Sequence, residues 1–228
     1  MHLTNKELAA MLLCAALGCT GAAAQAPATP QAQRFIVLLD AAHGGDDAGA
    51  QLKNNTPEKL WTLSFAQRLR SLLQARGFEV RTTRDTDQNP APAQRAAMAN
   101  HLLPQACLIL HGTQSGSGVH LFVTSMAAAQ PTKLMPWRTV QAGYVNRSIS
   151  LAAELNSALQ HSGLPVSLGR TTLATMDSMA CPAVAIELAP LADAMHQTPA
   201  ELDDKDYFSR SAEAIAAAMV AWRSEVHP

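Results

Sequence analysis

The chain has 228 residues, with 17 Lys and Arg, 18 Asp and Glu and a formal net charge of -1. A chain of this length forms one domain with room for a substantial core. No long run of Lys or Arg supplies the basic patch that phosphate neutralisation requires, so nucleic acid is excluded as the main partner.

Residues 1–24 have the layout of a secretory signal peptide. Lys6 precedes an apolar stretch, and an Ala-x-Ala cleavage site ends at Ala24. The stretch is too short for a transmembrane helix, so we expect an exported protein, periplasmic or extracellular, without a membrane-spanning segment. The alternative is a lipoprotein that carries its lipid on Cys19. Residues 25–33, rich in Ala, Pro and Gln, are expected to form a flexible tether.

The first predicted strand begins at Phe35. Residues 36–39 are apolar without alternation, a pattern typical of a parallel strand buried on both faces. His43 follows this strand, and Gly44 and Gly45 let the backbone turn sharply beside it. Ligands bind at the carboxyl ends of parallel strands, so His43 occupies a functional position.

Helices and strands alternate along the rest of the chain. Further strands are predicted over residues 78–82, 107–110, 119–124 and 183–188, with a short one within 166–175. Helices are predicted from Thr56 to Gly77 and over residues 93–103, 145–161 and 207–225, and residues 126–143 are expected to form an ordered loop or a short helical insertion. The pattern predicts a single three-layer α/β domain with a mostly parallel twisted sheet and helices on both faces.

Two cysteines, Cys107 and Cys181, remain once the leader is removed. Both lie near the starts of strands in the predicted sheet, and an exported protein can oxidise such a pair. A disulfide needs a Cα separation below about 7 Å, which the sequence does not give. We interpret the pair as two buried free thiols, with a disulfide as the alternative.

Titratable residues stand at three predicted strand ends, namely His43, His111 and Glu187, and Glu58 lies in the opening turn of the first helix. Two imidazoles and one carboxylate are the ligand set of a catalytic zinc ion, which keeps its fourth position for water. His43 and His111 are therefore candidate Zn²⁺ ligands, and Glu58 has the right chemistry for the third. Taken alone, Glu58 is better explained as a first-turn carboxylate that interacts with the dipole of its helix.

Glu187 follows an apolar run, and a carboxylate on a buried strand is costly unless it is paired or functional. Bound zinc lowers the pKa of its water to about 7 and polarises a carbonyl group. An amide hydrolase also needs a base that takes the proton of this water and returns it to the leaving nitrogen, and Glu187 can fill that role.

The same residues carry a resemblance to a known family. The motifs, in chain order, are Asp40-Ala41-Ala42-His43-Gly44-Gly45-Asp46, Glu58-Lys59, Thr83-Arg84-Asp85, Arg95 with Asn100, Leu110-His111, and Pro182 to Leu188. Over about residues 35–222 the chain resembles the zinc-dependent N-acetylmuramoyl-L-alanine amidases of the type 3 family. By that resemblance His43, Glu58 and His111 match the zinc ligands, Glu187 matches the catalytic glutamate, and residues 34–225 form the catalytic domain.

The resemblance implies an exported hydrolase that cuts the amide bond between N-acetylmuramic acid and L-Ala of peptidoglycan stem peptides. We expect a monomer, and an activator protein is left open. One alternative is a weakly active or inactive family member that binds peptidoglycan. Another is a zinc hydrolase of a different amide, because the metal chemistry is shared.

The chain departs from the family pattern at Ala42, at Gly112-Thr113-Gln114 and at Ala189-Pro190. None of these departures removes a predicted ligand, so they concern substrate fit and rate. Arg84 and Arg95 are expected to be surface or salt-bridge residues without a catalytic role.

Residues 112–153 and the histidines outside the predicted site bear on regulation and on further metal ligands. Residues 112–153 contain no Asp or Glu, so we predict that this segment does not block the metal with a carboxylate. The alternative is that Trp137 or His120 covers the groove. The remaining histidines are interpreted mostly as ordinary solvent-facing residues: His101, His120, His161, His196 and His227.

Overall fold

The computed structural model describes residues 34–130, 132, 135–192 and 200–226. The predicted signal peptide, the possible lipidation site at Cys19 and the tether at residues 25–33 lie outside the described residues. No helix in the described ranges is long and apolar enough to cross a membrane.

Within the described residues, six strands form one sheet in the order β2-β1-β3-β6-β4-β5. The strands are β1 Ile36–Ala41, β2 Glu79–Thr82, β3 Ala106–Gly112, β4 Gly118–Thr124, β5 Val166–Thr171 and β6 Ala183–Ala189. All neighbours are parallel except β4 and β6, which run antiparallel. The predicted α/β domain with a mostly parallel sheet is confirmed.

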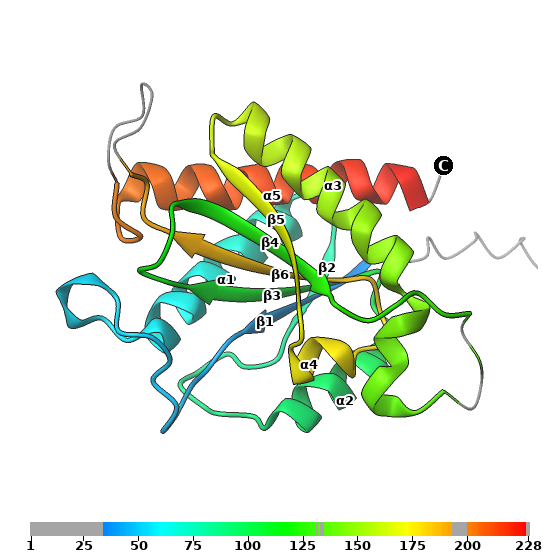
Figure 1. Ribbon diagram of the computed structural model, residues 1–228. Helices are drawn as coiled ribbons and strands as arrows, with labels where there is room; N and C mark the ends of the chain where they lie inside the picture. The colour runs from blue at the N-terminus through cyan, green and yellow to red at the C-terminus, as the bar shows by residue number, and fades with distance from the viewer. Residues whose placement is uncertain (1–33, 131, 133–134, 193–199, 227–228) are drawn as a thin grey trace, which may run out of the picture. The chain divides into compact units, whose positions relative to one another are not determined.

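Helices cover both faces of the sheet (Figure 1). The larger layer contains α1 Glu58–Ala75, α3 Val145–His161 and α5 Lys205–Val226, and the smaller one contains α2 Pro92–Leu102 and α4 Ala174–Asp177. Two 3-10 helices, η1 Lys53–Asn55 and η2 Trp137–Gly143, lie in the connections, and η2 is the predicted helical insertion.

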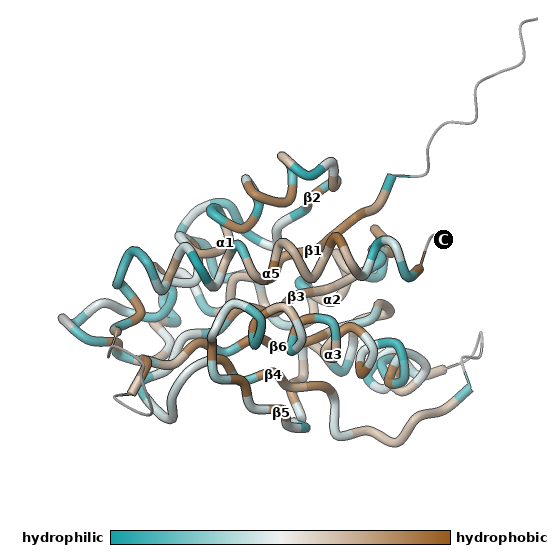
Figure 2. The backbone as a smooth tube through the Cα atoms, turned by 90° about the horizontal axis from the view of Figure 1, so that it is seen from above, coloured by the Kyte–Doolittle hydropathy of each residue, from teal (hydrophilic) through white to brown (hydrophobic). Residues whose placement is uncertain are grey.

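Alternate side chains of the central strands β1, β3 and β6 pack in two separate hydrophobic clusters. From β1, Leu39 packs in the cluster under α1, α3 and α5, whereas Leu38 packs in the cluster with residues of α2 and α4. Figure 2 shows β1 as a largely hydrophobic segment, in agreement with its burial on both faces. Because the second layer is small, it leaves room for a cleft at the carboxyl ends of the strands.

Cys107 and Cys181 form a disulfide, so the interpretation as free thiols is wrong. Strands β3 and β6 are parallel neighbours in which Cys107 pairs with Ala183. This register brings Cys181, two residues upstream, to a Cα distance of 6.2 Å from Cys107. The pairing depends on strand order, which the spacing of the cysteines does not reveal.

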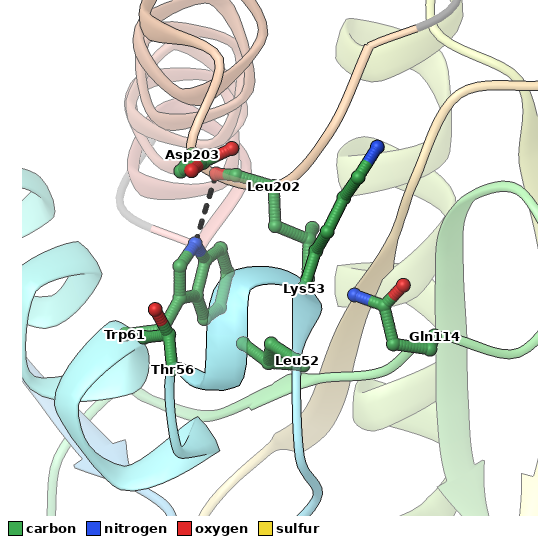
Figure 3. Close-up of a pocket in the computed structure, with 7 residues that line it drawn as sticks. All are labelled: Leu52, Lys53, Thr56, Trp61, Gln114, Leu202 and Asp203. Carbon is green, nitrogen blue, oxygen red and sulfur yellow. Dashed lines mark hydrogen bonds between the residues drawn. The ribbon is translucent and has the colours of Figure 1, made fainter.

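Trp61 joins α1 to the segment that precedes α5. Its indole Nε1 donates to the carbonyl oxygen of Leu202 at 2.9 Å, as Figure 3 shows. A small cavity of about 20 Å³ lies beside this bond, and Gln114 is part of its lining. The departure from the family pattern at Gln114 thus faces this cavity, whose lining contains none of the predicted metal ligands.

Candidate metal centre and catalytic carboxylate

The three predicted ligands meet at the carboxyl edge of the sheet. One ligand atom each of His43, Glu58 and His111 lies within 4.8 Å of the others. Glu58 Oε2 is 3.1 Å from His43 Nε2, and Glu58 Oε1 is 2.9 Å from His111 Nδ1. Two donors on one tetrahedral zinc ion lie about 3.3 Å apart, given bond lengths of about 2.0–2.1 Å. The donor types and their spacing therefore fit a zinc ion.

Glu58 is buried, and both of its oxygens accept hydrogen bonds from outside its own helix. Oε2 accepts from the amide of Ala50 at 2.8 Å and Oε1 accepts from the amide of Gly112 at 3.1 Å. Burial raises the pKa of Glu58, but its bonds with His111, His43 and Ala50 outweigh this effect and hold the pKa well below its usual range. Glu58 is therefore an ionised carboxylate fixed between two imidazoles, which the helix dipole alone does not explain.

His43 lies in a tight loop, and Gly49 passes close to its side chain. Its backbone has a positive φ of 62°, which is uncommon for a residue with a side chain. A Cβ on Gly49 would lie 2.6 Å from His43 Cδ2 and 2.7 Å from Glu58 Oε2. Only glycine lets the loop cross both side chains at this distance, so Gly49 is part of the construction of the site.

Asp47 is a functional candidate that the sequence did not reveal. Its Oδ2 lies 2.8 Å from Nδ1 of His43, on the side of the ring away from Glu58. This hydrogen bond lowers the pKa of Asp47. The ionised carboxylate accepts a hydrogen bond from Nδ1–H of His43, which leaves Nε2 for a metal ion. The i, i+4 spacing of the two residues is the only signal in the sequence, and it is a weak one.

Replacing Asp47 with Asn is expected to lower zinc affinity by about 10- to 100-fold, because partners of this kind orient the metal-binding ring and raise its basicity. Competition with a chelator of known affinity measures the effect. Asp46→Asn, at the exposed neighbouring residue, is the matched control and should leave the affinity unchanged. Equal affinities for the two variants would contradict the assigned role of Asp47.

Zinc affinity is also expected to depend on pH. The hydrogen bond with Glu58, opposed by burial and assisted by Asp47, raises the pKa of His43 to about 9 in the metal-free protein. Below this pKa an incoming ion must displace one proton from His43. Affinity should therefore rise about tenfold per pH unit between about pH 6 and about pH 8 from this group alone. Chelator competition across that interval tests the slope, and a flat profile would contradict it.

Arg84 and Arg95 are buried, so surface positions are wrong for both, whereas the alternative of a salt-bridge residue is confirmed for Arg95. Arg95 forms an ion pair with Asp40 at 2.6 Å and also donates to the carbonyl oxygens of Ala41 and His43, at 2.7 and 2.8 Å. Arg84 donates to the carbonyl oxygen of Ala41 at 2.9 Å and to neighbouring carbonyls. The two guanidinium groups thus donate to backbone carbonyls at and just after the end of β1, beside His43.

Glu187 lies on β6 next to His111 in the register, and its side chain is 33% exposed. Its other neighbour is His120 of β4, whose Nδ1 is 3.0 Å from Glu187 Oε1. His120 is an exception among the remaining histidines, which were mostly expected to face solvent, because its side chain is only 14% exposed and contacts the predicted base. His120 is not among the clustered metal-ligand candidates of the described residues.

An open cleft of about 430 Å³ borders the metal site. His43, Asp47 and His111 line one part of it, and residues 89–92 and Leu173 line another. These latter residues precede or begin α2 and α4, so the smaller helical layer supplies one wall. Two of the three clustered residues, His43 and His111, are thus open to an extended molecule that lies in the cleft.

The α/β fold and the His-Glu-His cluster define a class of domain with a candidate metal centre at the carboxyl edge of its sheet. Residues 37–221 match the family model Amidase_3, described as N-acetylmuramoyl-L-alanine amidase, and the chain belongs to this family.

Similar proteins agree with this membership. An N-acetylmuramoyl-L-alanine amidase of Mycobacterium tuberculosis is 30% identical over 154 residues, 62% of this chain and 59% of the relative. The chain thus spans little more than half of that relative's length. The solved structure of Ami1 from Mycobacterium smegmatis has a TM-score of 0.66 at 21% identity, covering 84% of this chain and 97% of Ami1. CwlD of Clostridioides difficile has a TM-score of 0.62 at 18% identity, covering 84% of this chain and 100% of CwlD. These two structures share the fold.

Proposed function

We propose that the protein is a zinc-dependent N-acetylmuramoyl-L-alanine amidase that cleaves the bond between N-acetylmuramic acid and L-Ala of peptidoglycan stem peptides. The observation that carries the proposal is the convergence of His43, Glu58 and His111 beside the strand of Glu187, in a chain of the amidase family. His43, Glu58 and His111 would hold the ion. When bound, zinc supplies a polarised substrate carbonyl and a water of pKa about 7.

The protein's own groups move the protons. Glu187 Oε1 is engaged by His120, so Oε2 is the oxygen that accepts a proton from the attacking water. The same oxygen then gives the proton to the amide nitrogen as its bond to the carbonyl carbon breaks, and the carboxylate is regenerated. Asp47 holds the proton of His43 at Nδ1, and the buried Glu58 stays ionised. The cleft lined by residues 89–92 and Leu173 would position the substrate.

We extend the proposal to the compartment and to partners. The disulfide between Cys107 and Cys181 supports export, because disulfides persist in oxidising environments. The leader at residues 1–24 supports the same route, with residues 34–225 as the catalytic domain. CwlD was solved in complex with the lipoprotein GerS, which supports assaying this protein with an activator as well as alone.

Digestion of purified peptidoglycan by the zinc-loaded protein, with mass spectrometry of the released fragments, tests the activity. We expect free stem peptides that begin at L-Ala, no release after treatment with a chelator, and recovery when zinc is returned. Failure to release peptides, by loaded protein that still sediments with the wall, would overturn the amidase in favour of a binding protein. Cleavage of free peptides but not of muramyl peptides would favour a hydrolase of another amide.

A further inference from the structure

We propose that His120 is a positioning residue for Glu187, holding one carboxylate oxygen so that the other faces the reacting water. This inference rests on the proposed function and adds to it a residue outside the metal site. It assigns a role to a histidine that is neither a candidate metal ligand nor the proposed base.

The direction of β4 creates the contact. Strands β4 and β6 run antiparallel with His120 directly opposite Glu187, and β3 places His111 opposite Glu187 on the other side. Paired residues of adjacent strands project from the same face of a sheet. His111, Glu187 and His120 therefore form a row that leads from a candidate metal ligand to the base and then to its partner.

The chemistry of the two groups decides which one donates the hydrogen bond. An ionised carboxylate can only accept hydrogen bonds, so the proton between Glu187 Oε1 and His120 Nδ1, 3.0 Å apart, belongs to His120. With Oε1 so engaged, the lone pairs of Oε2 are left for the proton of the reacting water. A carboxylate held at one oxygen also has fewer orientations to lose when the substrate binds.

The imidazole ring itself is held in a fitted slot. A Cβ on Gly116 would lie 2.5 Å from His120 Cε1 and 2.8 Å from Nε2, so the backbone of this glycine, at a φ of 81°, lies directly against the ring. The Phe122 ring packs edge-on to the imidazole at a centroid distance of 6.4 Å. An imidazole confined in this way presents Nδ1 in one direction, as an orienting group must.

Two substitutions separate donation from mere packing. His120→Leu removes the donor, and we expect kcat to fall about 10- to 100-fold with KM changed by less than about threefold, because the base is misplaced while substrate contacts remain. His120→Asn puts an amide N–H near the position of Nδ1 and should recover most of the loss. Both variants should bind one zinc ion as the wild type does. His101→Leu, at an exposed histidine of α2, is the matched control and should keep wild-type activity.

The outcomes distinguish the role of His120 from the amidase activity on which it rests. A wild-type protein without amidase activity would overturn the proposed function. An active wild type with an equally active His120→Leu would overturn the role of His120 alone. Equal losses in His120→Leu and His120→Asn, with zinc retained, would show that an N–H at Nδ1 is not what matters and would also overturn it.

A spectroscopic readout is independent of turnover. In the metal-free protein, long-range ¹H–¹⁵N spectra of the imidazole groups should show the His120 proton on Nδ1, and Glu187→Ala should alter that signal. A ring that carries its proton on Nε2 alone, with Nδ1 bare, would contradict the proposed hydrogen bond even if activity were never measured.

Discussion

Replacing Glu187 with Gln is expected to lower amidase turnover by about 10²- to 10⁴-fold, the range over which general acid–base groups contribute. The amide has nearly the shape of the carboxylate, and its oxygen can still accept the hydrogen bond from His120 Nδ1, so the fold should persist. The amide cannot take the proton of the attacking water. The rate of stem-peptide release, measured by mass spectrometry at equal zinc loading, gives the effect.

The control for this variant is Glu225→Gln, at an exposed glutamate near the end of α5. It removes the same charge from the surface and should leave turnover unchanged. Zinc content should be equal in the wild type and both variants, because neither residue belongs to the His43, Glu58 and His111 cluster. If Glu187→Gln kept a tenth or more of the wild-type rate, the base would have to be another group.

Replacing Arg95 with Met is expected to lower the free energy of unfolding by about 3–5 kcal/mol, the cost of removing one partner of a buried ion pair. Asp40 would stay buried without its cation, and the carbonyls of Ala41 and His43 would lose donors. The loss should loosen the turn that carries His43 and weaken zinc binding as well. Denaturant unfolding of the metal-free protein measures the change in the free energy of unfolding.

Arg70→Met provides the comparison, because Arg70 pairs with Asp85 on the surface at 2.8 Å. Exposed ion pairs contribute about 0–1 kcal/mol, so this change should be small. Combining Asp40→Asn with Arg95→Met should recover part of the loss, since no unpaired charge is then buried. A loss below about 1 kcal/mol for Arg95→Met alone would contradict the buried pair.

The fold was largely predictable because its pattern is local. Apolar runs without alternation marked the central strands, and the helix predicted over residues 145–161 matches α3, Val145–His161. The three candidate ligands were predictable for a related reason. Carboxyl ends of parallel strands share one edge of a sheet, so His43, which follows β1, and His111, near the end of β3, were expected at that edge. Glu58 lies in the first turn of α1, the helix that follows the loop after β1.

The features that were missed depend on neighbours far apart in the chain. Strand β4 has the same pattern in either direction, and only its antiparallel pairing with β6 brings His120 to Glu187. Arg95 is buried where it donates to the carbonyl oxygens of Ala41 and His43. The sequence does not reveal that an arginine 52 residues after His43 meets these oxygens. The disulfide between Cys107 and Cys181 likewise required the order of the strands.

Strand β6 lies between β3 and β4, although only residues 113–117 separate those two in the chain. The two strands do not pair with each other in the sheet, and β6, the last of the described strands in chain order, lies between them and pairs with both. Pairing over such separations is slow compared with local folding. A chain halted before residue 183 contains His111 and His120 but lacks the strand that carries Glu187 between them, so it has no proposed base.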